Sequence, residues 1–183
     1  MTGYKETTID TSAYLQKAEQ ALTTWSKETT RPENFRLDVR VTPDDLLKAA
    51  GKILDLDRYY LSTITGLDNL KPVNANTPAP AATESAAPPD DSLEALYHFS
   101  CKAAVVTLRV KVPRTAPRIP SICSLIPSAS LYEREAMDMF GFEFSGTPNT
   151  DRLLLSEDWP KGVYPLRKDF TGLPAKTAQK KGK

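Results

Sequence analysis

The sequence is poor in the residues that bind metals and carry out covalent catalysis, with two cysteines and one histidine among 183 residues. Cys101 and Cys123 stand outside any CxxC motif and have no histidine cluster nearby, so they do not support a zinc or iron–sulfur site. His98 lies in a strand-like segment and has no G-x-S-x-G elbow to serve. A G-x-G-x-x-G motif, a P-loop and an aromatic RNA-binding signature are also missing. We therefore expect this chain itself to bind no metal, no cofactor and no nucleic acid.

Long apolar runs and a strong net charge are absent too. No segment approaches the roughly 18 apolar residues that a membrane-spanning helix needs, and the N-terminus has no apolar signal region. We expect the chain to stay in the cytoplasm or in an equivalent reducing compartment. The formal net charge of +1 creates no overall field that favours nucleic acid or an anionic membrane. With 40% hydrophobic residues, the chain can bury one ordinary core, which predicts one domain with tails.

Alternating and helix-spaced apolar residues predict a small α+β fold. The segment 35–41 alternates apolar and charged residues, which is the pattern of a half-buried strand. The expected elements are helices at 14–25 and 44–54, strands at 35–41 and 58–65, and a hairpin of strands at 93–100 and 104–112. Regular pairing is not expected after the hairpin because of three prolines, Pro113, Pro117 and Pro120. We expect a small mixed or antiparallel sheet with the helices on one face.

Two stretches are predicted to lie outside this packed unit. Pro72 to Asp90 contains five prolines and six alanines, so we interpret it as a dispensable insertion loop. From Gly141 onward, the spacing of glycines and prolines indicates an extended arm that lacks a core of its own. The predicted division is therefore an α+β domain at 1–140, interrupted at 72–90, and an extended C-terminal arm with a basic tail at 141–183.

The segment 131–140 is predicted to be a helix with two unlike faces. Its apolar face carries Tyr132, Ala136, Met139 and Phe140. Its opposite arc carries Arg134, Glu135 and Asp138. Ser130 and Glu133 have the spacing of a capping box, and Gly141 is placed to take the left-handed conformation that ends a helix. Arg134 and Asp138 stand at i and i+4 and can pair. The charged arc is either a solvated face or a docking surface.

Three motifs follow one another in the second half of the chain, namely Glu133-Arg-Glu-x-x-Asp-Met-Phe-Gly141, Asp151-Arg-Leu153 and Pro165-Leu-Arg-Lys-Asp169. In this order they resemble the NuoC-type, or 30 kDa, subunit of respiratory complex I. The resemblance covers 93–170 and extends more loosely to 36–68. The stretch 159–169 also resembles the corresponding subunit of membrane-bound, energy-converting nickel–iron hydrogenases. Two positions depart from the family pattern, because Thr147 replaces a common histidine and Leu131 a common aromatic residue.

The resemblance implies a non-catalytic scaffold subunit in the peripheral part of a complex I-like oxidoreductase. In that family the iron–sulfur clusters, the flavin and the quinone or nickel–iron site belong to other subunits. The expected partners are a large subunit that resembles the nickel–iron hydrogenase large chain and the neighbouring cluster-bearing subunits. The chain would support electron transfer to quinone or to protons from the cytoplasmic side of a membrane, with which it would associate through the complex. A quinone-reducing and a hydrogen-evolving parent complex both remain open.

Two groups of residues are expected to bind these partners. The docking helix would contribute Glu133, Arg134, Glu135, Asp138, Phe140 and Gly141. The arm at 151–170 would contribute Arg152, Arg167, Lys168 and Asp169. We expect Arg167 and Asp169 to find their partners on another chain, because they lie beyond the last sheet element. The competing hypothesis is a stand-alone enzyme that uses carboxylates for acid and base catalysis, chosen from Glu133, Glu135, Asp138 and Glu143. Neighbouring carboxylates on a helix without a cleft signal give that hypothesis little support.

Overall fold

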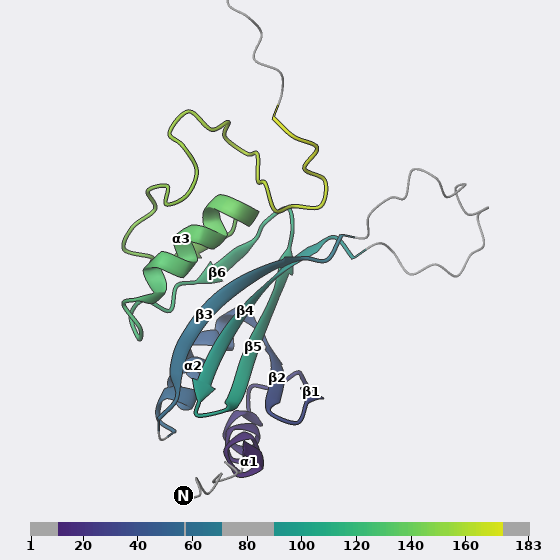
Figure 1. Cartoon of the computed structure of the whole chain (residues 1–183), viewed down its shortest axis with the longest axis vertical. Helices are drawn as coiled ribbons and strands as arrows, with labels where there is room; N and C mark the ends of the chain where they lie inside the picture. Colours follow the sequence, from purple (N-terminus) through teal and green to yellow (C-terminus); the bar gives the residue numbers. More distant parts are fainter. Residues whose placement is uncertain (1–10, 57, 71–89, 174–183) are drawn as a thin grey trace, which may run out of the picture.

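The computed structural model describes residues 11–56, 58–70 and 90–173, which form a layered α+β fold (Figure 1). In chain order the elements are α1 (Thr11–Leu22), β1 (Glu28–Glu33), β2 (Arg36–Val41), the 3-10 helix η1 (Pro43–Asp45), α2 (Leu46–Leu54), β3 (Tyr60–Asp68), β4 (Ser92–Cys101), β5 (Ala104–Pro113), β6 (Arg118–Pro120), α3 (Ala129–Phe140) and β7 (Glu143–Ser145). The predicted insertion, apart from Asp90, and the predicted basic tail lie outside the described residues.

Five strands form a mixed sheet in the order β1-β2-β5-β4-β3. The predicted hairpin is its centre, because β4 and β5 pair antiparallel from Ser92 opposite Pro113 to Cys101 opposite Ala104. β2 lies parallel to β5, whereas β1 and β3 pair antiparallel with their neighbours and form the two edges. The expected α+β class and mixed sheet are therefore confirmed.

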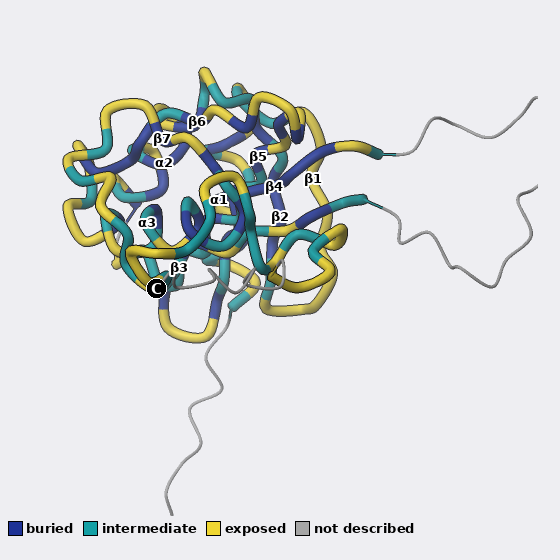
Figure 2. The backbone as a smooth tube through the Cα atoms, turned by 90° about the horizontal axis from the view of Figure 1, so that it is seen from above, coloured by how far each residue is buried: buried dark blue, intermediate teal, exposed yellow. Residues whose placement is uncertain are grey.

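The core lies on one face of this sheet, between the strands and the helices (Figure 2). Apolar side chains at alternate positions of β2, β4 and β5 point to it, and Tyr97 and Phe99 are fully buried there. α1 covers these strands with Leu15, Ala18 and Leu22, and α2 with Leu46, Ala49, Ala50 and Ile53. α3 packs on the same face, because its Phe140 ring fills the space beside Gly66, which pairs with the core residue Ala95. All three helices thus cover one face, as the sequence predicts.

The edge strands differ most from the sequence prediction. β1 was not expected, and every one of its residues is exposed, so it has no apolar side to produce an alternating pattern. β3 does not stop at Gly66 but continues to Asp68. A glycine is required at this position of the strand, because any side chain here would overlap the Phe140 ring.

A second, two-stranded sheet corrects the expectation that the prolines after β5 exclude strand pairing. β6 pairs with β7 in parallel, and Ile119 lies opposite Phe144. Pro117 takes part as an acceptor only, since the Glu143 backbone N–H donates to its carbonyl oxygen at 2.9 Å. Proline lacks the donor but keeps its carbonyl group, so a short pair of this kind remains possible. Because Phe142 and Phe144 are buried, the packed fold also continues past residue 140, where the sequence predicts its end.

Candidate docking site

The C-terminal arm, defined here as residues 146–173, has no helix or strand, and it passes α3 and reaches the end of the sheet (Figure 1). A segment without secondary structure must find other partners for its backbone N–H and C=O groups wherever these are shielded from water. Charged side chains supply many of these partners. They attach the arm at α3, within the arm itself, at the end of α3 and at the end of the sheet.

The first attachment uses the charged arc of α3. One carboxylate oxygen of Asp138 accepts the backbone N–H groups of residues 153, 154 and 155 at 2.9, 2.8 and 3.2 Å. Asp138 is only 8% exposed, so these three donors replace water around the buried charge. One turn earlier, Arg134 donates to the carbonyl oxygens of residues 151 and 152 at 2.8 and 3.0 Å. These two side chains therefore hold the whole leucine turn 151–155 against the helix.

The second attachment lies within the arm. Arg152 donates to the carbonyl oxygens of Ser156 and Trp159 at 2.6 and 2.9 Å. The Trp159 indole in turn donates to the Val163 carbonyl oxygen at 2.8 Å, and its ring centroid lies 6.3 Å from that of Phe170. The arm is thereby folded into compact loops, although it contains no regular element.

The third attachment is at the C-terminal end of α3. Gly141 has a φ of +76°, which confirms the predicted left-handed end of the helix, and the Tyr164 ring occupies the space where its side chain would stand. The Arg167 guanidinium carbon lies 4.4 Å from the centroid of that ring, and its Nε donates to the Phe140 carbonyl oxygen at 2.7 Å. Burial lowers the pKa of Arg167 from its usual value, and Arg114 acts in the same direction. The arm thus satisfies a carbonyl group that the helix leaves without a partner.

The fourth attachment ties the end of the arm to the sheet. Arg114, which follows β5 and is 8% exposed, pairs with Asp169 of the arm. It also lies 3.4 Å from a carboxylate oxygen of Asp68 at the end of β3, and that same oxygen accepts the Lys168 backbone N–H at 2.8 Å. The Lys168 side chain itself is exposed. Sequence reasoning did not select Asp68 or Arg114, because nothing in their local pattern distinguishes them from other charged residues at strand ends.

Glu133 is buried inside the fold and does not belong to the exposed charged face of α3. It is fully buried, and its two carboxylate oxygens accept the Ser121 hydroxyl at 2.8 Å and the Ile122 backbone N–H at 2.9 Å. The Cys123 thiol donates to it at 3.3 Å, and burial raises the pKa of this thiol above its usual value, so the donor keeps its proton. Glu133 therefore fixes the connection between β6 and α3.

Three expectations about these residues are wrong. No capping box forms, because α3 already begins at Ala129 and Glu133 turns to the preceding connection instead of the helix end. Arg134 and Asp138 do not pair with each other, since the arm's backbone offers both of them partners. Arg167 likewise has a partner within this chain, the Phe140 carbonyl oxygen, although its partners were expected on another chain. Asp169 also has a partner within this chain, because it pairs with Arg114.

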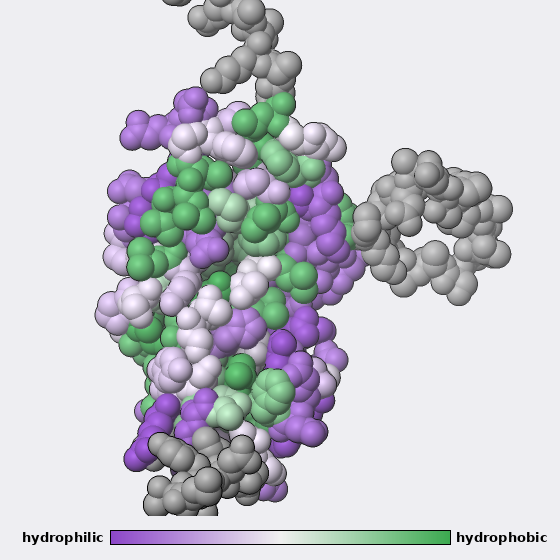
Figure 3. Space-filling view, in the orientation of Figure 1, coloured by the Kyte–Doolittle hydropathy of each residue, from purple (hydrophilic) through white to green (hydrophobic). Residues whose placement is uncertain are grey.

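Apolar side chains point outward from this region. Figure 3 shows hydrophobic residues gathered at the surface over α3 and the C-terminal arm. Leu131 of α3 is 56% exposed, and the leucines of the arm at positions 154, 166 and 173 are 57%, 54% and 51% exposed. Glu135 of α3 is also exposed. The face that the sequence marks as a docking surface is therefore built from leucines as well as charges.

A cavity of about 270 Å³ lies between the end of α3 and the arm, and two carboxylates of the competing enzyme hypothesis line it. Asp138 is engaged by the backbone of the leucine turn, and Glu143 pairs with Arg118 at 2.7 Å. The other two carboxylates do not join them, since Glu133 is enclosed at the β6–α3 connection and does not line the cavity, and neither does Glu135. Of the four carboxylates, Asp138 and Glu143 share this cavity, and both already have partners within the chain.

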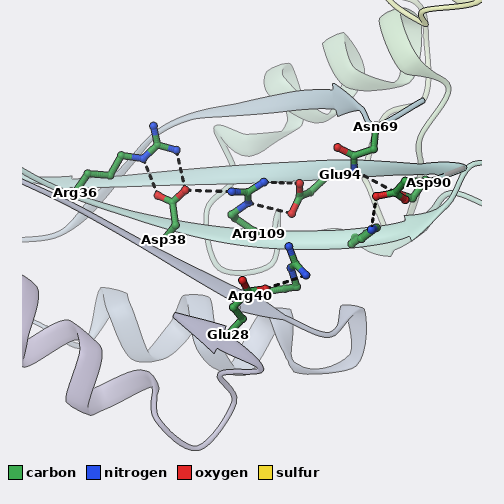
Figure 4. A network of polar contacts seen from close by, with 10 residues as sticks. Glu28, Arg36, Asp38, Arg40, Asn69, Asp90, Glu94 and Arg109 are labelled. Carbon is green, nitrogen blue, oxygen red and sulfur yellow. Dashed lines mark hydrogen bonds and ion pairs between the residues drawn. The ribbon is translucent and has the colours of Figure 1, made fainter. Parts of the chain in front are cut away.

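A second charged cluster lies on the sheet face opposite the helices (Figure 4). Arg109 of β5 binds Glu94 of β4 through two nitrogens at 3.0 and 2.6 Å and lies 3.4 Å from Asp38 of β2. Asp38 also receives Arg36 at 2.6 Å. Both carboxylates are 2% exposed although no described helix covers this face. The charged positions of β2 were visible in the sequence, but the register that joins three strands into one cluster was not.

Within the residues that the structure describes, no group of three or more metal-ligating side chains is arranged to hold a metal ion. In the same part of the chain, no helix has the length and apolar character needed to cross a membrane.

Comparison with known proteins identifies the family. Residues 39–176 match the family described as respiratory-chain NADH dehydrogenase, 30 Kd subunit. An F(420)H(2) dehydrogenase subunit of Methanosarcina mazei is 38% identical over 94 residues, covering 50% of this chain and 59% of the relative. The membrane-bound hydrogenase subunit beta of Pyrococcus furiosus is 38% identical over 87 residues, covering 48% and 50%. The chain thus spans about half the length of these curated relatives.

A solved structure agrees in fold. A chain of the membrane-bound sulfane sulfur reductase, an archaeal respiratory membrane complex, superimposes with a TM-score of 0.63 at 23% identity, covering 85% of this chain and 84% of the other. The matching family covers well over half of the chain and includes α3 and the whole of the arm. The protein described here belongs to the family of the 30 Kd subunit of the respiratory-chain NADH dehydrogenase.

Proposed function

We propose that this chain is a scaffold subunit in the peripheral part of a complex I-like, membrane-bound oxidoreductase. It docks on a large subunit that resembles the nickel–iron hydrogenase large chain and helps to hold the neighbouring cluster-bearing subunits. It supports electron transfer to quinone or to protons without carrying the redox groups. Iron–sulfur clusters, with flavin or a nickel–iron centre according to the branch, belong to the partners in this proposal, and the chain meets the membrane through the complex.

One observation supports this proposal most strongly. The C-terminal arm has no core of its own, yet its backbone is held by buried or half-buried charges while its leucines at positions 154, 166 and 173 remain exposed. A chain that orders an irregular segment and leaves apolar side chains outside it is typical of a subunit whose surface is completed by a partner. The relatives named above are themselves subunits of a dehydrogenase and a hydrogenase.

The predicted partner-binding residues divide into two roles under this proposal. Glu135 and Lys168 direct their side chains outward and can meet a partner directly. Asp169 pairs with Arg114 but its side chain is 62% exposed, so it can also meet a partner. The other residues position the surface from within, and these are Glu133, Arg134, Asp138, Phe140, Gly141, Arg152 and Arg167. The docking surface therefore depends on charged residues that do not themselves reach the partner.

Affinity purification of the tagged chain from its own cells tests the proposal. Membranes would be solubilised in a mild detergent, and the recovered proteins identified by mass spectrometry. We expect a large subunit of the nickel–iron hydrogenase type together with cluster-bearing subunits, and iron in the complex but not in the chain purified alone. Recovery of the chain without any oxidoreductase subunit, or stoichiometric iron, nickel or flavin in the isolated chain, would contradict the proposal.

A further inference from the structure

The leucine turn 151–155 combines a firmly held backbone with an exposed apolar side chain. The backbone N–H of Leu154 is directed to Asp138 on α3, while its side chain is 57% exposed. Leu131, 56% exposed, stands one turn before Arg134 and so lies on the same side of the helix as the two side chains that hold the turn. We call Leu131 and Leu154 the leucine patch.

The turn is ordered before any partner arrives. Three of its N–H groups are bound by Asp138, two of its carbonyl groups by Arg134, and Arg152 is folded back onto the arm. An ordered loop does not lose conformational freedom again when it binds, so an apolar contact made by it gains affinity. Holding an exposed leucine in one place with five hydrogen bonds brings no evident gain to the isolated fold. It is useful for a contact with another molecule.

The charges around the patch indicate what kind of molecule this is. Exposed carboxylates flank the turn at Asp151, Glu157 and Asp158, whereas Arg134 and Arg152 are half-buried. The charge directed outward near the turn is therefore mainly negative, although Lys161 is exposed as well. An anionic lipid surface would repel this acidic surround. A second copy of the chain, placed on the same patch by a two-fold axis, would bring two acidic surrounds together. A different protein with basic residues around an apolar pocket has the complementary charge.

We propose that the leucine patch inserts into an apolar pocket with a basic rim on a partner subunit of the oxidoreductase, and that Asp138 is the positioning residue that holds it. This inference rests on the proposed function and adds the contact through which it operates. Leu154 is the central apolar contact and Leu131 extends it along α3. The acidic surround aligns the two chains, and Asp138 acts only through the turn.

The test compares tagged variants in the intact complex. Leu154→Ser and Leu131→Ser should each lower the amount of partner subunit recovered per tagged chain at least about fivefold, because apolar interface residues that become polar leave a pocket unfilled. Leu47→Ser is the matched control, since Leu47 is an exposed leucine on α2, away from the patch. All three free chains should unfold at the same urea concentration as the unchanged chain, because the side chains are exposed.

Two further variants test the positioning role of Asp138. Asp138→Asn keeps an oxygen acceptor and should retain most of the partner recovery, whereas Asp138→Ala should lose it. Hydrogen exchange of the amides at 153–155 in the free chain should be faster in the alanine variant than in the asparagine variant. A loss of recovery in Asp138→Ala with unchanged exchange at these amides would overturn the positioning role.

The outcomes separate this inference from the function on which it rests. If the unchanged chain recovers no oxidoreductase subunit, the proposed function fails. If it does recover them and both leucine variants recover them equally well, only the leucine patch is wrong. If the unchanged chain binds vesicles of phosphatidylcholine and phosphatidylglycerol and Leu154→Ser does not, the leucine contacts a membrane and the proposal is overturned. The same holds if Leu154→Ser abolishes a dimer of the free chain seen by analytical ultracentrifugation.

Discussion

Charged side chains do different work in the sheet and in the C-terminal arm. On the sheet face opposite the helices, Arg109 pairs with both Asp38 and Glu94 across three strands whose backbone groups already bond to each other. At the arm, Asp138 and Arg134 of α3 bind backbone groups of the arm, and Arg167 of the arm binds a backbone carbonyl group of α3. The sheet therefore uses charges in addition to its secondary structure, whereas the arm uses them in place of it.

This difference implies two levels of stability within one chain. A strand of the sheet is held by a ladder of backbone bonds and by the apolar core, so one lost charge pair is a perturbation of a cooperative unit. The arm depends on a few side chains, each of which controls several backbone groups, so a single substitution can release a whole segment. Local opening of this kind has a lower free energy than global unfolding. Substitutions in each region can show whether the arm opens locally while the sheet stays folded.

The largest effect is expected from Arg109→Leu in the sheet. This change leaves Asp38 and Glu94, both 2% exposed, without their shared cation. Removing one partner of a buried pair costs several kcal/mol, and because Arg109 is itself partly exposed we expect a loss of about 2 to 3 kcal/mol in the free energy of unfolding. Urea unfolding followed by circular dichroism measures it. Arg118→Leu is the control, since its pair with Glu143 is exposed on both sides, and an equal loss there would refute the role of burial.

The next effect is expected from Gly141→Ala, which acts at the junction of the two regions. A side chain here would need a left-handed backbone, at a cost of about 1 to 2 kcal/mol, and would overlap the Tyr164 ring. The arm should therefore detach at this point, and limited proteolysis should cut it sooner while the sheet stays folded. Gly146→Ala is the matched control, because Gly146 also has a positive φ, of +86°, but nothing within 4 Å of its added carbon. Equal protease sensitivity of both variants would show that the strained backbone alone causes the cleavage, and that the overlap with the Tyr164 ring does not contribute.

The sequence predicts the sheet far better than the arm, and the reason is physical. The segments of β2, β4 and β5 bury one side and alternate, so their period shows where they lie and which side chains enter the core. The role of Asp138 depends on backbone groups that are 15 to 17 residues away and have no side-chain signature. The family resemblance selected Arg134 and Asp138 because they belong to a motif, and the structure shows which groups of this chain they contact. Their partners within the chain could not be read from helical spacing, which suggested a pair between Arg134 and Asp138.

A smaller effect is expected from Arg167→Ala, which concerns the arm alone. The change removes one hydrogen bond to the Phe140 carbonyl group and the contact with the Tyr164 ring, worth about 1 to 2 kcal/mol together, and frees the end of the arm. Hydrogen exchange should quicken in the arm around residues 164–170, while the amides of β4 and β5 keep their protection. Exchange of these arm amides in Arg167→Lys should be faster than in the unchanged chain and slower than in Arg167→Ala, because lysine keeps the charge over the ring but not the planar guanidinium group. Faster exchange throughout the sheet would mean that the arm and the sheet unfold together.

The smallest effect should come from His98, whose contacts place it with the sheet. Its two ring nitrogens lie 3.0 and 3.1 Å from the hydroxyl oxygens of Thr107 and Thr65, so the ring joins three strands without a charge of its own. Burial lowers the pKa of His98 from its usual value, and Arg36 lowers it further while Asp38 opposes the change. Because the unfolded chain then binds a proton more readily than the folded one, stability is complete above about pH 6.5 and falls as the pH falls below it. Urea unfolding from about pH 7.5 to pH 5.5 should show this decline in the unchanged chain and a flatter profile in His98→Gln. Amide exchange measured in the leucine turn, corrected for the intrinsic dependence on pH, should not follow the titration, and if it does, the arm is coupled to the sheet more closely than their separate contacts imply.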